Sequence, residues 1–438
     1  MVKRNLVFLI ITAVVVRCLL FLFNVHDSIY DRIEFTTPLT SWKRVLEGLS
    51  LLDHGLSPYA GDSVHEPPLV LLLFYLLRNK SNGIPLYIVF MMFDILTGFL
   101  LYLAAKCHCR NLLSRQKRDL KHYSQNVAPI LITLDHLENL PVLVCASYLL
   151  NPFTIASCVA QSTGLITNLS LTFSMYFAFL GSTSLAMCFV ALASYKSLYC
   201  IMLVVPLTII LTKKKMDESK YHVSLVRAVI SSLTFFSFWM GVYLALSRVV
   251  IGSWQFLDAS YGFTLRVPDL TPNMGLFWYL FLEMFDHFRE FFVLVFQLNA
   301  FFYVIPLTSL LRNDPVFLFY TLSSVIAIFK SYPALGDFSI PFALFVSWSH
   351  LYPYMKNIFF VGCMFLFSSI LAPIFWHLWI YAGSANANFF YAVTLAYSSA
   401  QIFLLGDVIY AFLRRNFDLE HGITRKKVND ETMIVLLK

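Results

Sequence analysis

The chain has 438 residues, of which 58% are hydrophobic and only 13% are charged, and it carries a net charge of +7. Soluble domains carry about 25% charged residues, so this composition excludes a soluble protein and predicts an all-α polytopic membrane protein. No long polar stretch remains from which a further domain could be built, so we expect one integral membrane domain over residues 1–438. The basic residues sit in short segments between apolar runs, a pattern that excludes a nucleic-acid partner.

Apolar runs near the length that spans a bilayer, about 20 residues, recur along the chain and predict 10 to 12 transmembrane helices. The first run follows Lys3 and Arg4 as in a signal peptide, but Arg17 interrupts it and no small-residue cleavage site follows. We therefore expect an uncleaved first helix with its N-terminus in the cytosol. The clear candidate spans are 6–23, 84–105, 139–160, 165–181, 225–251, 276–297, 357–378 and 389–413. Shorter or broken runs lie at 67–77, 183–195, 197–212, 298–311, 315–330 and 338–352.

The longest polar stretch, 24–66, follows the first helix, and we expect it to be the first lumenal loop. It contains SWKRVLEGLSLLDHG, which predicts an amphipathic helix with Ser41 as its N-cap and Gly55 as its stop. The run 67–77 is too short to span, so we expect it to lie in the lumenal interface.

Clusters of basic residues identify the opposite side of the membrane. By the positive-inside rule we expect the loops 106–126 and 213–224 and the tail 414–438 to be cytosolic. The eight cysteines are scattered and show no disulfide spacing. The tripeptide Cys107-His108-Cys109 lacks a second pair of ligands nearby, so we expect no metal and no cofactor.

The first lumenal loop is rich in carboxylates, which allows two interpretations. Membrane glycosyltransferases that use dolichol-linked sugars keep an acidic pair in this loop as metal ligands or a base, and HDSIYDRIE is a loose version of that arrangement. Alternatively the acids pair with Arg32, Lys43 and Arg44 in a solvated loop, because no tight pair of acids occurs there. The residues concerned are Asp27, Asp31, Glu34, Asp53, Asp62 and Glu66, with His26, His54 and His65 interleaved.

Segment 267–285, VPDLTPNMGLFWYLFLEMF, combines polar residues with a run of aromatic rings. The tripeptide at 271–273, Thr-Pro-Asn, predicts that a helix starts there from the lumenal face. Rings at helical spacing then predict an aromatic stripe, which serves either helix packing or contact with a lipid. They are Phe277, Phe281, Phe285 and Phe288, and the acids Glu283 and Asp286 favour a functional role because acids in membrane helices are paired or functional.

Segment 376–392, WHLWIYAGSANANFFYA, places small and amide residues in an apolar, aromatic context. Amides are costly in hydrocarbon unless they hydrogen-bond. Asn386 and Asn388 therefore either cap the last long helix or bind the hydroxyl and phosphate groups of a ligand. Trp379 suits the membrane interface, and the small residues around Ser384 allow a close approach of backbones.

Lys330 and Asp337 sit between two apolar runs. A lysine at this place either neutralises a phosphate or extends its amine to the interface.

Several long, irregular stretches resemble the PIG-U family of glycosylphosphatidylinositol (GPI) transamidase subunits. They occur in order along almost the whole chain: 37–61 (TPLTSWKRVLEGLSLLDHGLSPYAG), 149–163 (LLNPFTIASCVAQST), 267–285, 327–337 (AIFKSYPALGD) and 376–392.

The resemblance implies a multi-pass protein of the endoplasmic reticulum membrane, similar in fold to the GT-C class of mannosyltransferases. It implies a complex that removes a C-terminal signal peptide and attaches a GPI anchor. The other subunits are the K subunit, which supplies the catalytic cysteine, the S and T subunits and the GPI attachment protein. This chain would then be a non-catalytic subunit that binds the GPI lipid and presents it to the partner's thioester.

The resemblance also assigns residues to a GPI-binding site. It implies that Asn386 and Asn388 contact the GPI glycan, and it connects segment 267–285 with lipid recognition. An apolar groove for the lipid tail and amides at its rim suit such a ligand. The expected site residues are Asp269, Asn273, Phe277, Trp278, Phe281, Lys330, Trp379, Ser384, Asn386 and Asn388.

Other functions stay open beside this one. An active GT-C mannosyltransferase would use Asp27, Asp31 or Glu34 with dolichol-phosphate-mannose during GPI synthesis. A structural subunit would only clamp its neighbours and have no lipid site. A transporter is disfavoured, because few ionisable residues lie in helix centres.

Overall fold

The computed structural model describes residues 2–80, 86–218, 224–423, 427–428 and 431–432. Its secondary structure is helical except for two short antiparallel strands, β1 (Lys427–Val428) and β2 (Glu431–Thr432). The predicted cytosolic loop 213–224 and tail 414–438 lie partly outside the described residues.

The helical architecture confirms the expected polytopic membrane protein. Within the described residues, six helices are long and apolar enough to cross a membrane, or up to seven if one bent pair, Ala128–Glu138 with Leu140–Leu149, is counted as a span. The long spans are α1 (Val2–Leu22), α5 (Leu86–Asp119), α12 (Leu225–Ile251), α16 with α17 (Asp286–Phe302 and Val304–Leu311), α20 (Ile358–Ile380) and α21 (Ala387–His421).

Shorter apolar helices accompany these spans. A helix of 13 to 17 residues is about 20 to 26 Å long, less than the hydrocarbon core of about 30 Å. With the six or seven long spans, these four helices give 10 or 11 spans only if all of them, including α4, cross under the cover of their neighbours. They are α4 (Pro68–Lys80), α9 (Gly164–Leu180), α10 (Thr183–Lys196) and α18 (Pro315–Phe329).

The remaining elements are short helices that connect or cover these spans. They are α2 (His26–Ile29), α3 (Trp42–Asp53), η1 (Leu120–His122), η2 (Ala128–Ile130), α6 (Leu134–Glu138), α7 (Leu140–Leu149), α8 (Pro152–Val159), η3 (Leu198–Leu203), α11 (Val204–Glu218), α13 (Gln255–Leu257), η4 (Asp258–Gly262), α14 (Phe263–Arg266), α15 (Trp278–Leu282), η5 (Leu335–Phe338), α19 (Ser339–Phe345) and η6 (Val346–Tyr354).

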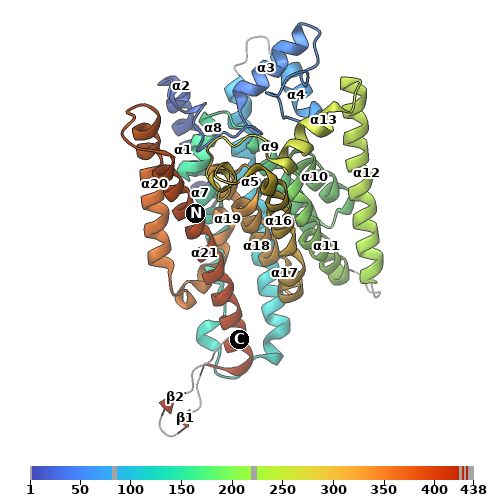
Figure 1. Cartoon of the computed structure of the whole chain (residues 1–438). Coiled ribbons are helices and arrows are strands. Elements are labelled where there is room, and N and C mark those ends of the chain that lie inside the picture. The colour runs from blue at the N-terminus through green and yellow to red at the C-terminus, as the bar shows by residue number, and fades with distance from the viewer. Residues whose placement is uncertain (1, 81–85, 219–223, 424–426, 429–430, 433–438) are drawn as a thin grey trace.

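The two ends of the molecule differ in the segments they carry. Figure 1 shows α2, α3, α4 and α13 gathered at the upper end and the C-terminal ends of α5 and α21 at the lower end. The first loop thus lies opposite the basic end of α5, as the predicted topology requires. The amphipathic helix is confirmed as α3, which follows Ser41 and ends before Gly55 in the left-handed region. Its buried face, with Trp42, packs on α4 through a contact with Phe74.

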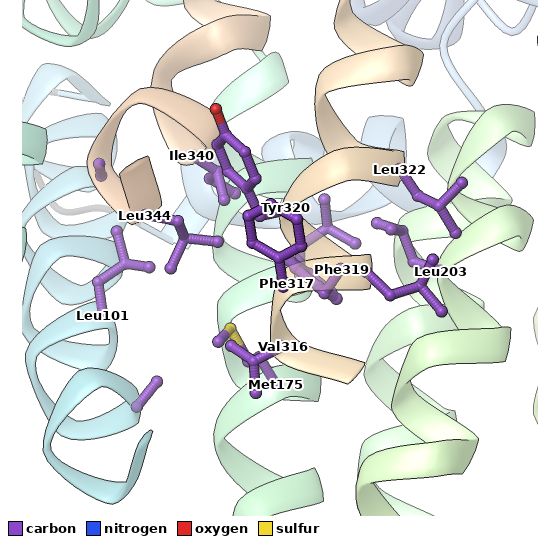
Figure 2. Packing of buried hydrophobic residues seen from close by; sticks show 14 of the residues in the cluster. Leu101, Met175, Leu203, Val316, Phe317, Phe319, Tyr320, Leu322, Ile340 and Leu344 are labelled. Carbon is purple, nitrogen blue, oxygen red and sulfur yellow. The ribbon is translucent and has the colours of Figure 1, made fainter. Parts of the chain in front are cut away.

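The core is centred on α18. Every residue from Pro315 to Ile328 is buried, so this helix has protein on all sides. Figure 2 shows its side chains Phe317 and Leu322 among residues from α5, α9, η3 and α19. Helix packing inside a membrane depends on such close contacts, because lipid tails are as apolar as the side chains themselves.

Two of the predicted spans are wrong in their boundaries. The run 139–160 is broken into α7 and α8, because Asn151 caps α8 by accepting a hydrogen bond from the Phe153 amide (2.9 Å) and Pro152 occupies the first helical position. The run 276–297 is also broken, since α15 ends at Leu282 and α16 begins at Asp286.

A fully buried ion pair ties the first helix into the bundle. The Arg17 side chain on α1 donates from Nε to Asp94 Oδ2 on α5 at 2.7 Å and from Nη2 to the carbonyl of Leu149 at 3.0 Å. Both charged side chains are 0% exposed. Removing one partner from such a pair leaves an uncompensated buried charge.

We expect Asp94→Ala to lower the free energy of unfolding by about 4 kcal/mol, because Arg17 then keeps its charge without a carboxylate. The measurement is thermal unfolding of the detergent-purified protein. Asp217→Ala is the matched control, since its pair with Arg118 is more than half exposed on both sides and such pairs contribute about 0 to 1 kcal/mol. Equal stability of the two variants would contradict the role of the buried pair.

Candidate functional site

The two unusual segments, 267–285 and 376–392, meet in space. We define the aromatic junction as the rings of Trp278, Trp379, Phe390 and Tyr391. Trp278 lies 6.5 Å from Trp379 in a stacked arrangement, 6.3 Å from Phe390, and 5.6 Å from Tyr391 in an edge contact. The Tyr391 hydroxyl also donates to the carbonyl of Leu276 at 2.8 Å. Segments about 100 residues apart are thereby held together by rings and one hydrogen bond.

The chain before the junction is not the helix that the sequence predicts. The carboxylate of Asp269 accepts from the Thr271 amide (3.0 Å), and the Asn273 side chain accepts from the Gly275 amide (2.8 Å). These local bonds favour turns over a helix, so the first helical residue is Trp278 rather than a residue next to 271–273.

The predicted phenylalanine stripe is interrupted at the break between α15 and α16. Phe277 and Phe281 pack on Phe296 of α16, with ring centroids 4.3 and 5.4 Å apart, whereas Phe285 is exposed beyond the end of α15. The crevice beside Phe277, Trp278 and Phe281 has a volume of about 10 Å³, the space of a single water at most. These rings therefore form a packed wall with no room for a lipid tail between them.

The amide residues lie at the exposed end of the junction. Asn386 caps α21, because its side-chain oxygen accepts from the Asn388 backbone amide at 3.1 Å, which confirms the capping interpretation. The side chains of Ser384, Asn386 and Asn388 are all exposed, and Asn388 interacts with the hydroxyl of Tyr279. Capping uses the side-chain oxygen of Asn386 and not its amide nitrogen, which can still donate a hydrogen bond.

Lys330 does not join this group. Its amine lies 2.6 Å from Asp337 Oδ1, and both line a cavity of about 60 Å³ with Lys196 and Tyr199. The charge of Lys330 is thus already neutralised within the chain. The cavity has room for a few water molecules but not for a sugar or a lipid headgroup.

Asp269 lies at a third location, separate from the amide residues and from the internal cavity. Its carboxylate accepts from Arg44 on α3 at 3.1 Å, 225 residues away in the sequence. It also lines an open polar cleft between the first loop and the segment around η4. The expected site residues therefore divide among the aromatic junction with its amides, the internal cavity and this cleft.

The acids of the first loop are dispersed among different partners. Ion pairs join Asp31 to Lys43, Glu34 to Arg32, Asp53 to Arg78 and Glu66 to Lys196, and Asp27 lies 3.2 Å from the ring of His26. The predicted pairing with Arg32 and Lys43 is confirmed, while Arg44 binds Asp269 instead. Among the described residues, no group of three or more His, Cys, Asp or Glu side chains could hold a metal ion.

Sequence reasoning missed the buried cluster of Glu66, Lys196 and Thr163. The Lys196 amine donates to both carboxylate oxygens of Glu66 (2.6 and 2.7 Å) and to the Thr163 hydroxyl (2.9 Å), and that hydroxyl donates to Glu66. One signal was available, since a lone lysine inside an apolar run needs a partner.

Comparisons with known proteins find GPI transamidase components that match most of the chain. A family model described as GPI transamidase subunit PIG-U matches residues 11–397. The GPI-anchor transamidase component PIGU of Homo sapiens is 45% identical over 98% of this chain and 99% of the human protein. The corresponding mouse protein is 44% identical over 98% of this chain and 99% of its own length. The GPI transamidase component GAB1 of Saccharomyces cerevisiae is 30% identical over 92% of this chain and 93% of the yeast protein.

We expect Trp278→Ala to loosen the segment 381–386, because the ring that contacts Trp379, Phe390 and Tyr391 is lost and a cavity remains. Limited proteolysis of the purified protein should then cut this segment about tenfold faster. Trp254→Ala is the control, since Trp254 is 51% exposed and should leave the rate unchanged. Identical cleavage of both variants and the unaltered protein would show that the junction does not hold the amide segment.

Proposed function

The chain belongs to the PIG-U family of GPI transamidase subunits, and from this premise we propose that it binds the GPI lipid and presents it for attachment to the C-terminus of proproteins. The observation that carries the proposal is the meeting of segments 267–285 and 376–392. Together they put two exposed amides, Asn386 and Asn388, beside a packed aromatic junction. The location that follows from this role is the endoplasmic reticulum membrane.

The chemistry of the ligand matches that arrangement. GPI carries sugars and a phosphoinositol on a lipid tail, so its site needs hydrogen-bonding groups beside an apolar surface. Aromatic side chains also flank the amides, with Tyr381 68% and Phe389 50% exposed. The adjoining helix α20 exposes further apolar residues in its C-terminal half, such as Ile370 and Ile374. The tail therefore runs along this outer surface, while the amides meet the hydroxyls of the head.

A non-catalytic role is supported by the state of the first-loop acids. Asp31, Glu34 and Glu66 are each held in an ion pair with a different base, so they do not form the close acidic pair that a sugar transferase uses. The thiol for transfer would come from the K subunit. The S and T subunits and the GPI attachment protein would be the other partners, in line with the relatives' description as transamidase components.

We expect the double substitution Asn386→Leu and Asn388→Leu to reduce anchor transfer at least tenfold without dissociating the complex, because two amides that meet the head are removed. The measurement is surface display of a GPI-anchored reporter in cells that depend on the variant, together with co-purification of the subunits.

The control for this experiment separates ligand contact from helix capping. Serine is also a good N-cap, so Asn386→Ser combined with Asn388→Leu preserves the start of α21 but removes both amides, and transfer should fall nearly as far as in the double-leucine variant. Full transfer by the double-leucine variant would refute the assignment of these residues.

Loss of the chain should leave mature GPI accumulating beside uncleaved proprotein, because the defect then lies at transfer. The measurement is lipid analysis of labelled GPI intermediates with an immunoblot of a proprotein, and re-expression of the chain is the control. Accumulation of a precursor that lacks one mannose would instead identify a GT-C mannosyltransferase, with Asp27, Asp31 or Glu34 in its active site.

A further inference from the structure

An open polar cleft lies at the end of the molecule that carries the first loop. Its volume is about 1160 Å³, slightly above the roughly 300 to 1,000 Å³ of typical small-molecule sites. One wall is α3 with the chain at 59–65, and the other is the stretch from Gln255 to Asp269. The two walls come from parts of the sequence about 200 residues apart, and the ion pair of Arg44 with Asp269 connects them.

His65 lines this cleft and has an incomplete set of hydrogen bonds. The residue is 5% exposed and stacks on Phe263 with ring centroids 3.5 Å apart. Its Nδ1 lies 2.8 Å from the carbonyl of Ala259, and because a carbonyl only accepts, Nδ1 carries the hydrogen. The other ring nitrogen, Nε2, is buried and has no partner within the described part of the chain.

The protonation state of His65 determines whether Nε2 donates or accepts a hydrogen bond. Burial lowers the pKa of the ring below its ordinary value, against the opposing effect of the nearby backbone carbonyls of Ala259 and Asp62. The ring is therefore neutral at pH 7, and Nε2 is a hydrogen-bond acceptor. A buried acceptor is costly when it is left unsatisfied, so a donor from outside the chain that reached Nε2 would be stabilising.

The charges around the cleft also favour a donor-rich ligand. Lys43 pairs with Asp31 at 2.9 Å, and Arg266 pairs with Asp258, so these bases are neutralised by their own neighbours. Two carboxylates on the lining, Glu47 and Asp62, form no ion pair within the described residues; Glu47 accepts only from the Ser63 hydroxyl at 2.9 Å. The cleft thus offers acceptors in excess, which suit hydroxyl and ammonium groups.

We propose that this cleft binds the glycan part of the lipid headgroup, with His65 Nε2 accepting a hydrogen bond from a sugar hydroxyl. The inference rests on the proposed function and extends it from the amide rim to a second subsite. The chain from Asp269 leads directly from the cleft to Trp278 in the aromatic junction. An acyl chain does not suit a lining of charged residues, whereas an extended oligosaccharide does.

The test uses the complete complex, purified with variants of this chain. His65→Asn keeps a donor near the position of Nδ1 and removes Nε2, while His65→Gln restores a polar atom near Nε2 and serves as the matched comparison. Binding of GPI with its full head and of phosphatidylinositol, which has no glycan, is measured for each. The water-soluble deacylated GPI glycan is used as a competitor.

We expect His65→Asn to weaken GPI binding about tenfold, the loss of one hydrogen bond, and to leave phosphatidylinositol binding unchanged. His65→Gln should bind GPI more tightly than His65→Asn, and the free glycan should compete most effectively with GPI for the unaltered complex. Asp62→Asn, an exposed substitution that does not disturb folding, should weaken GPI binding a few fold and confirm the site independently.

Other results would overturn the cleft as a glycan site. GPI binding that is unchanged in both His65→Asn and Asp62→Asn, but lost when Asn386 and Asn388 are replaced, rejects the cleft and keeps the proposed function. Loss of a partner subunit from both cleft variants, with GPI still bound, assigns the cleft to a polypeptide of that subunit. An unaltered complex that binds no GPI rejects the proposed function together with this subsite.

Discussion

The pairing of Glu66 with Lys196 is the constraint on which the end of the molecule with the first loop depends. Both side chains are almost fully buried, 2% and 3% exposed, and an isolated charge in such surroundings is too costly to persist. The pair therefore fixes the end of the first loop against the end of α10. The Glu66 carbonyl also accepts from Tyr59 at 2.6 Å, so the loop that forms one wall of the cleft is held by the same residue.

Further contacts extend along the chain from this ion pair. His65 precedes Glu66 in the chain and is placed against Ala259 and Phe263, which brings the second wall into contact. Asp269 continues that wall and pairs with Arg44. The chain then turns, through the Asn273 bond to Gly275, into the aromatic junction. A series of contacts that starts at one buried ion pair thereby connects the cleft with the amide rim.

Local features of this architecture could be predicted from the sequence, and long-range ones could not. The bounds of α12 match the predicted span 225–251, and Asn386 caps α21, because hydropathy and capping depend on neighbouring residues. The break at Asn151 could also have been predicted, because Asn-Pro is typical of a helix start, although it lies inside a long apolar run. The pairing of Asp269 with Arg44 across 225 residues leaves no local pattern. For the same reason the aromatic junction was visible only as two separate segments.

The complete burial of α18 has a consequence for how the protein enters the membrane. A helix inserts into the membrane independently when transfer of its apolar surface into lipid is favourable and its length spans the hydrocarbon core. From Pro315 to Ile328 this helix has no lipid-facing side in the finished fold, and its 15 residues are too short to span unaided. Its insertion is therefore coupled to helices on both sides of it in the sequence, including α19, which is made later. Biogenesis must keep this segment sheltered until those neighbours have been synthesised.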